Sequence, residues 1–318
     1  MTFTADGEHL IGGGEDVRVW RVRDGREIAT MSEARAIYCL SVSNDGRWIA
    51  AGRGQGGLFV WQWDPKTYEV SFHAQLPHHV SGVDFSPDST QLVTATEEYL
   101  ATIWNIATRR GTRTLQHEGW VTTTKYSAEG DRIATAVFQK SILIWDSNDG
   151  RLLVNIPFQL IPNYDVGFLW LSNKLLVVSG SKIEQIDVHT GSVVSEWPVF
   201  VSDHPSCISL PQHEAFVAYS TSHTVRFWDT SARTQLDPVQ CPESIQSITL
   251  SPDGRLLAIA AREKKIIVKR LSRITVSFVN CSTLACPNPY VSRNRRSISM
   301  SLRSMHGSVA DSQTQMHY

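Results

Sequence analysis

Residues 126–146 read YSAEGDRIATAVFQKSILIWD, and the architecture of this chain follows from the pattern in them. The segment begins at the end of a predicted strand and passes through a tight turn, Ser127-Ala128-Glu129-Gly130, into a strand predicted at Arg132–Val137. A short polar loop then leads to another strand, predicted at Ser141–Trp145. Strands joined by so few residues are typical of an antiparallel meander.

Positions equivalent to Trp145 recur along the chain. They are Trp20, Trp61, Trp104, Trp145, Ile186, Trp228 and Lys269. Successive positions are separated by 41, 43, 41, 41, 42 and 41 residues. A fixed period of this size indicates a repeat architecture, in which each unit is one small sheet that is stable only against its neighbours. Seven equivalent positions therefore predict a ring of seven small sheets.

Turn signals precede most of these positions at a similar distance. They are Ala5-Asp6-Gly7, Asn44-Asp45-Gly46, Pro87-Asp88-Ser89, Ala128-Glu129-Gly130 and Pro252-Asp253-Gly254. Units five and six keep only traces of the signal. The predicted strands between the turns, such as Ile142–Trp145 and Leu256–Ala260, are apolar on both faces. This pattern is typical of sheets that pack against neighbours on both sides.

The totals exclude several classes of protein. A formal net charge of -1 gives no general attraction to nucleic acid or to an anionic membrane. Five cysteines without a Cys-x-x-Cys pair argue against a disulfide framework and against a zinc site. The start of the sequence lacks a signal-peptide pattern, and no apolar run approaches the ~18 residues of a membrane span. We therefore expect a cytoplasmic or nuclear protein without a membrane segment and without a cofactor.

Several motifs recur in phase with the period. They are FSPDS at 85–89, LSPDG at 250–254, the Trp-Asp pairs at 145–146 and 228–229, the near-pair Trp104-Asn105, and His117 ahead of a strand predicted from Val121. In these motifs the chain resembles the WD-repeat (WD40) family over roughly residues 1–280. The resemblance implies an all-β fold, a seven-bladed β-propeller of four-stranded antiparallel blades.

The chain departs from this family at the position about six residues before the Trp, where many family blades carry an Asp. In the family this Asp completes a His–Ser/Thr–Asp–Trp hydrogen-bond network. Here the position holds Gly14, Gln55, Glu98, Gln139, Ser222 and Glu263. Because an incomplete polar network stabilises poorly, we expect the blades to depend mainly on apolar packing.

The two ends of the repeat region leave the closure of the ring open. Residues 1–3 correspond to the end of the innermost strand of the first unit. The first blade therefore either has three strands or takes a strand from downstream, for example Ser282–Cys286; a truncated start explains the pattern equally well. Ile274–Val279 is predicted as the outer strand of the last unit. Residues 281–318 are rich in Ser and Arg and are predicted to be a disordered tail.

Two apparent ligand motifs do not meet the structural requirements of their sites. Gly52-x-Gly54-x-x-Gly57 matches the dinucleotide fingerprint as a string, but a predicted strand follows it where that fingerprint needs a helix N-terminus. His78-His79 is a weak metal motif, because adjacent residues on a strand point to opposite faces. We therefore predict neither a nucleotide site nor a metal site.

Two other classes of function remain open. A propeller hydrolase or lyase would carry its catalytic groups at the mouth of the central channel, and the acids and bases near predicted loops are Asp165, Glu98, Glu263 and His223. An RNA-associated factor would use the basic tail, although the overall charge makes nucleic acid the less favoured partner. A substrate receptor for a ubiquitin ligase is disfavoured, because Asn148 and Ser231 stand where that signature requires a basic residue.

The main prediction is a non-catalytic scaffold for protein–protein interaction, a monomeric propeller within a larger complex. In the family, partners dock on the face made by the loops between second and third strands and by the connections between blades. Mapped onto this chain, that face is predicted to carry Arg53, Glu98, Tyr99, Trp120, Phe138, Lys140, His223, Arg262 and Lys264. Trp, Tyr and Arg are the residues most enriched at binding hot spots.

Overall fold

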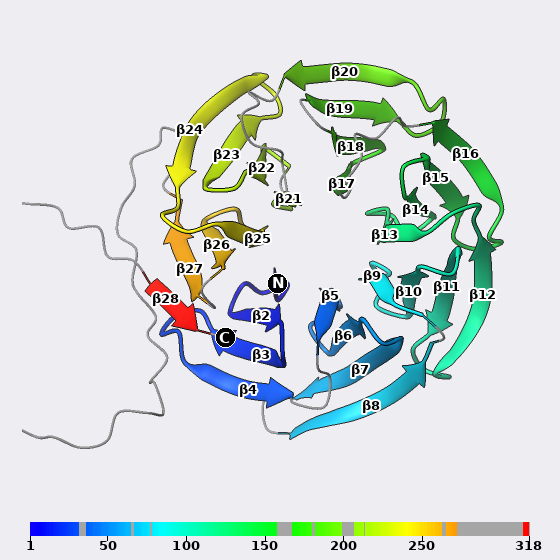
Figure 1. Cartoon of the computed structure of the whole chain (residues 1–318), viewed down its shortest axis with the longest axis horizontal. Helices are drawn as coiled ribbons and strands as arrows, with labels where there is room; N and C mark the ends of the chain where they lie inside the picture. Colours follow the sequence, from blue (N-terminus) through cyan, green and yellow to red (C-terminus); the bar gives the residue numbers. More distant parts are fainter. Residues whose placement is uncertain are drawn as a thin grey trace, which may run out of the picture.

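The chain folds into a ring of small antiparallel sheets (Figure 1). The computed structural model describes residues 1–31, 36–64, 67–76, 78–157, 167–179, 182–198, 207–212, 214–262, 265–271 and 314–317. Within these residues, 28 strands form seven four-stranded sheets. This confirms the predicted seven-bladed β-propeller. No helix long and apolar enough to cross a bilayer occurs in this part of the chain.

Each blade is a meander of four consecutive strands, numbered from the channel outward. Blades 1 and 2 contain β1 (Thr2–Phe3), β2 (His9–Gly13), β3 (Val17–Arg21), β4 (Glu27–Met31), β5 (Ile37–Val42), β6 (Trp48–Arg53), β7 (Gly57–Asp64) and β8 (Thr67–Gln75). Blades 3 and 4 contain β9 (Val80–Phe85), β10 (Gln91–Thr96), β11 (Leu100–Asn105), β12 (Arg110–Gln116), β13 (Val121–Tyr126), β14 (Arg132–Val137), β15 (Ser141–Asp146) and β16 (Leu152–Pro157).

The remaining three blades follow the same order. Blade 5 contains β17 (Gly167–Leu171), β18 (Lys174–Ser179), β19 (Lys182–Asp187) and β20 (Val193–Pro198). Blade 6 contains β21 (Cys207–Ser209), β22 (Phe216–Ser220), β23 (Thr224–Asp229) and β24 (Thr234–Gln240). Blade 7 contains β25 (Ile245–Leu250), β26 (Leu256–Ala261), β27 (Lys265–Arg270) and β28 (Thr314–His317).

The ring closes between blade 7 and blade 1, where the inner strands β25 and β1 contact each other. Blade 1 has four strands, so the three-stranded alternative is wrong, although β1 has only two residues. In blade 7 the outer position beside β27 is occupied by Thr314–His317, which the sequence analysis placed in the tail. The outer strand predicted at Ile274–Val279, the proposed closing segment Ser282–Cys286 and the rest of the tail lie outside the described residues.

The seven equivalent positions lie at the same place in every blade. Each is on the third strand and faces a large apolar residue of the second strand. The pairs are Trp20 with Leu10, Trp61 with Ile49, Trp104 with Leu92, Trp145 with Ile133, Ile186 with Leu175, Trp228 with Val217, and Lys269 with Leu257. The repeat read from the sequence is therefore confirmed, and it gives the correct register as well as the correct number of blades.

The hydrophobic core consists of seven separate clusters, and each cluster fills the space between two neighbouring blades. For example, Ile103 and Leu115 of blade 3 pack with Ile133 and Trp145 of blade 4. The cluster that closes the ring joins blade 1 to blade 7. Strands that are apolar on both faces produce this arrangement, because each blade meets a neighbour on either side.

The predicted turns between first and second strands are held by short side chains. In blade 3, Ser86 Oγ donates to Asp88 Oδ1 at 2.6 Å and accepts from the Gln91 backbone N–H at 2.9 Å. The same pair of interactions occurs at Ser43 in blade 2 and at Ser251 in blade 7. These contacts satisfy backbone groups that the tight turn leaves without strand partners.

Candidate interaction surface

One face of the ring gathers two kinds of loop, and we call it the connection face. In a meander, the loops between second and third strands lie on the same side as the connections from one blade to the next. Backbone hydrogen bonds join the two kinds of loop. The backbone N–H of Phe138 donates to the Trp120 carbonyl at 2.8 Å, and the backbone N–H of Arg262 donates to the Ser244 carbonyl at 2.9 Å. The face is therefore a set of mutually bonded loops on a rigid ring.

Exposed aromatic side chains on this face occur in three consecutive blades. The exposed fraction is 67% for Tyr38 in blade 2, 46% for Tyr99 in blade 3 and 49% for Trp120 at the entry to blade 4. The Phe138 ring lies 5.7 Å from the Trp120 ring, between centroids. We call these four residues the aromatic sector. Large exposed aromatic surface is unfavourable in water and commonly marks an interaction site.

Tyr38 was missed by the sequence analysis, and its position has a structural cause. The pairing of β5 with β6 shifts between Ile37 and Cys39, so Tyr38 has no partner in the register. Such a β-bulge re-aims the side chain of the extra residue. The residues at 37–39, Ile-Tyr-Cys, carry no local signal for this bulge.

Tyr99 has a backbone conformation that is unfavourable for its residue type. Its φ is 64°, in the left-handed region, and the equivalent loop position in blade 2 is held by Gly56 with φ of 77°. A tyrosine in this region costs roughly 1 kcal/mol more than glycine. The Tyr99 carbonyl accepts a hydrogen bond from the His117 N–H at 2.8 Å, which holds the loop in place.

A buried hydrogen-bond chain lies beneath this loop. His117 Nδ1 is 3.0 Å from the Leu115 carbonyl and so donates to it, which leaves Nε2 to accept from the Thr135 hydroxyl at 2.8 Å. Thr135 in turn accepts from Trp145 Nε1 at 2.8 Å. Burial lowers the pKa of His117 to about 4, so the ring is neutral at pH 7. Blade 4 thus has the His–Thr–Trp part of the network described in the sequence analysis, and Gln139 holds the position of the missing Asp.

Charged groups surround the aromatic sector. Glu97 Oε1 lies 2.9 Å from His79 Nδ1, and Glu98 contacts His78. The His79 ring in turn packs edge-on against Tyr38, with 4.2 Å between centroids. On the other side of the sector, Lys140 Nζ bonds to Glu118. Three carboxylates therefore lie on the same loops as the exposed rings of Tyr99 and Trp120.

The other predicted site residues are not part of this cluster. Arg53 lies in blade 2 with its guanidinium 6.0 Å from the centre of the Phe59 ring. His223 and Arg262 are exposed on the connection face, but they belong to blades 6 and 7, across the ring from blade 3 (Figure 1). Lys264 lies outside the described residues. The structure brings together Glu98, Tyr99, Trp120, Phe138 and Lys140, pairs Arg53 with Ile37 beside the Tyr38 bulge, and leaves His223 and Arg262 apart.

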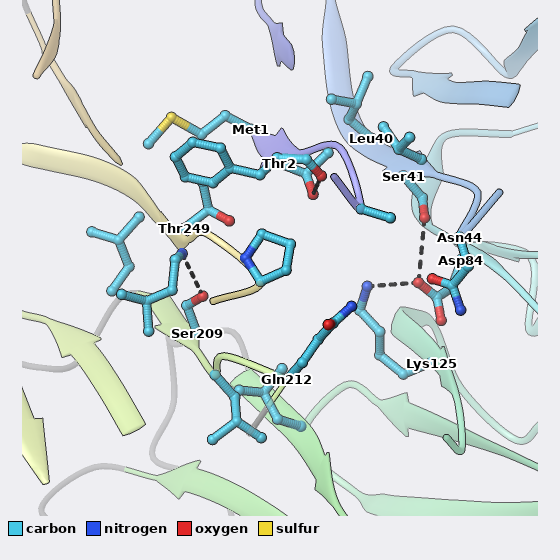
Figure 2. A pocket seen from close by; sticks show the side chains of 18 of the residues that line it. Met1, Thr2, Leu40, Ser41, Asn44, Asp84, Lys125, Ser209, Gln212 and Thr249 are labelled. Carbon is cyan, nitrogen blue, oxygen red and sulfur yellow. Dashed lines mark hydrogen bonds and ion pairs between the residues drawn. The ribbon is translucent and has the colours of Figure 1, made fainter. Parts of the chain in front are cut away.

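The central channel contains a cavity of about 360 Å³ that is lined by all seven blades (Figure 2). Register-equivalent residues of the inner strands form a ring in its wall. They are Thr2, Ser41, Asp84, Lys125, Leu169, Ser209 and Thr249. The one acid and the one base of this ring bond to each other, with Lys125 Nζ 2.8 Å from Asp84 Oδ1.

The cavity does not contain the acids and bases considered for catalysis. Glu98 and His223 lie on loops outside its lining, and Asp165 and Glu263 are outside the described residues. Asp84 also accepts from the Tyr126 backbone N–H at 2.9 Å, so its oxygens hold two blades together. No group of three or more potential metal ligands occurs in the part of the chain that the structure describes.

Comparison with known families matches three repeats in this chain. The model of the WD domain, G-beta repeat, matches residues 25–62, 70–105 and 110–146. Each match begins within or up to two residues before the outer strand of one blade and ends in the third strand of the next, as in β12–β15. The sequence repeat is therefore offset by one strand from the structural blade, so each match spans two neighbouring blades.

Relatives and solved structures are similar to this chain over most of its length. Periodic tryptophan protein 2 of Arabidopsis thaliana is 26% identical over 256 residues, which cover 75% of this chain and 27% of the relative. WD repeat-containing protein 18 of Danio rerio is 22% identical over 306 residues, covering 84% of this chain and 68% of the relative. This chain thus spans about a quarter of the length of the first relative.

A solved structure, Kuenenia stuttgartiensis hydrazine synthase, superposes with a TM-score of 0.76 at 14% identity, covering 86% of this chain and 95% of that one. At such low identity the likeness shows the fold alone. With three matched WD repeats, a period kept along the chain and seven blades in one ring, this protein is a seven-bladed β-propeller that is similar to WD-repeat proteins.

Proposed function

We propose that this chain is a non-catalytic platform for protein–protein interaction and that a partner protein docks on the aromatic sector. The observation that carries the proposal is the exposure of Tyr38, Tyr99 and Trp120 in consecutive blades of one face. Aromatic side chains bury a large area with few rotatable bonds, which suits them as anchors for a partner. The mutually bonded loops beneath them keep the anchors in a fixed arrangement.

The backbone of Tyr99 supports the same proposal. Its left-handed φ would be accommodated at lower cost by glycine, as at Gly56 of the neighbouring blade. A residue held in an unfavourable conformation and half exposed stabilises the fold little. Such positions cluster at binding sites.

The test compares two double variants on the same face. Tyr99→Gly with Trp120→Ala removes two anchors of the sector, whereas His223→Ala with Arg262→Ala changes two exposed residues across the ring. Each variant and the wild type are used to purify complexes from the native source, and bound proteins are quantified by mass spectrometry. We expect the first variant to lose a specific set of partners that the second retains.

Folding of both variants is checked by circular dichroism and thermal unfolding before purification. Equal recovery of all partners by both variants would exclude the aromatic sector as the docking site. Loss with the blade 6 and blade 7 variant alone would move the site to the other side of the ring.

A further inference from the structure

We infer that the aromatic sector binds an arginine-containing segment of its partner; this inference rests on the docking role proposed above. The segment is recognised by exposed rings and by carboxylates of the same loops. A guanidinium is a planar cation that stacks on aromatic faces and donates paired hydrogen bonds to carboxylates.

The carboxylates accompany the rings along the chain. Glu97 and Glu98 immediately precede Tyr99, and Glu118 stands two residues before Trp120. Their side chains remain accessible, with exposed fractions of 44%, 41% and 84%. Each exposed anchor in blades 3 and 4 therefore has an accessible carboxylate within two residues.

The cations of the surrounding surface leave these carboxylates available. Lys140 bonds to Glu118 but reaches neither Glu97 nor Glu98 in any described contact. Arg53 lies over Phe59 and donates to Gln55. The described contacts of Glu97 and Glu98 are to the imidazoles of His79 and His78, not to a lysine or arginine. Both carboxylates are therefore accessible to a guanidinium from a partner.

Other kinds of segment fit this surface less well. An acidic segment would meet carboxylates of the same sign. A wholly apolar segment would cover the rings but would remove water from the neighbouring carboxylates without replacing its hydrogen bonds, which costs free energy. An arginine satisfies both groups at once, because its plane covers a ring while its edge faces a carboxylate.

The experiment selects a random peptide library on the immobilised full chain. Bound peptides are then sorted by whether they also bind the Tyr99→Gly and Trp120→Ala double variant. Peptides that need the two rings are sequenced, and their affinities are measured for wild type, for Glu97→Gln with Glu98→Gln, and for Glu129→Gln. Glu129 is an exposed control on a turn of the opposite face.

We expect ring-dependent peptides to be enriched in arginine. Their affinity should fall on the order of tenfold for each carboxylate removed and should be unchanged in the Glu129→Gln control. Ring-dependent peptides without excess arginine, or with affinities that ignore Glu97 and Glu98, would overturn this inference but leave the docking role intact. The absence of any ring-dependent peptide would overturn both.

Discussion

Single residues show how unevenly the polar network of this family is kept. Trp145 Nε1 bonds to Thr135 and Trp104 Nε1 bonds to Thr94 at 3.0 Å, because blades 3 and 4 carry threonine on the second strand. Blade 6 holds Tyr219 at that position, and Trp228 Nε1 has no hydrogen-bond partner among the described residues. The cost of losing an indole N–H should therefore differ between blades.

The first prediction compares Trp145→Phe with Trp228→Phe. Both indoles are almost fully buried, so the loss of apolar area is similar. Trp145→Phe also removes a buried hydrogen bond, whereas Trp228→Phe removes an unpaired donor. We expect the free energy of unfolding to fall by about 1 kcal/mol more for Trp145→Phe. Urea unfolding of both variants measures the difference, and equal losses would contradict it.

The second prediction concerns how the free energy of unfolding changes at acidic pH. Burial lowers the pKa of His117 from 6.5 to about 4, so the unfolded chain binds a proton that the folded chain does not. The stability contributed by the neutral ring is present above pH 6.5 and is lost as the pH falls from 6.5 towards 4. The full loss is on the order of 3 kcal/mol.

Urea unfolding between pH 7 and pH 4.5 tests this dependence, with His117→Gln as the comparison. The variant should be less stable than wild type at pH 7, because the contacts to Leu115 and Thr135 change. Its stability should also fall less steeply with acid. Parallel curves for the two proteins would show that His117 does not cause the slope.

The third prediction separates stability from binding at Tyr99. In Tyr99→Gly the left-handed backbone is relieved, while the more flexible unfolded chain and the lost ring contacts act against stability. We expect the free energy of unfolding to stay within about 1 kcal/mol of wild type. Gly56→Ala at the equivalent loop position should be clearly destabilising, because a Cβ there would meet the Leu76 carbonyl oxygen. Thermal unfolding of both variants measures these changes in stability. A large loss in Tyr99→Gly, or none in Gly56→Ala, would contradict the prediction.

At the scale of elements, inner strands of neighbouring blades are joined by a recurring bond. Asp84 of β9 accepts from the Tyr126 N–H of β13, and Ser209 of β21 accepts at 3.0 Å from the Leu250 N–H of β25. The two acceptors occupy equivalent register positions. A side chain facing the channel thus satisfies a backbone group of the next blade.

The fourth prediction follows from this bond. Asp84→Ala leaves the Tyr126 N–H and Lys125 without their acceptor and should cost about 2 kcal/mol. Asp84→Ser should recover part of that loss, because a hydroxyl fills the role in blade 6. Lys125→Met should cost less than about 1 kcal/mol, since its partly exposed ion pair contributes little. The order of the three variants in urea unfolding is the measurement.

Elements differ in how far local sequence predicts them. Strands such as Arg132–Val137 could be predicted, because turn chemistry and apolar runs mark both ends. The position of β28 could not, because four polar-flanked residues far from β27 carry no local signal for pairing with it. The candidate site shows the same division. Tyr99 and Trp120 follow from loop positions, whereas Tyr38 depends on a bulge that the residue pattern does not specify.

For the whole molecule, the number of blades follows from the number of repeats, since each of the seven equivalent positions belongs to one sheet of the ring. The partner cannot be predicted in this way. Propellers with the same ring geometry have many different functions. The loop residues that distinguish these functions do not follow the repeat, so the period does not predict them. Closure also differs from the other contacts, because blade 1 and blade 7 lie at the two ends of the repeat region and no short connection joins them.

The fifth prediction tests the consequence of this closure. Leu10 and Leu92 are both fully buried at equivalent positions, but Leu10 packs between blades 7 and 1 and Leu92 between blades 2 and 3. Either Leu→Ala change should lower the free energy of unfolding by roughly 2–5 kcal/mol. Only Leu10→Ala should open the ring locally, because short connections still tether blades 2 and 3.

Hydrogen exchange followed by mass spectrometry reads this out by strand. In Leu10→Ala, exchange should accelerate in β1–β3 and β25–β27 ahead of the remaining blades, with protection elsewhere retained. In Leu92→Ala, the strands of blades 2 and 3, on either side of the substituted side chain, should keep exchanging at the same rate as the rest of the ring. If both variants accelerate exchange evenly around the ring, the closing interface is no weaker than the others, and the propeller opens as one cooperative unit.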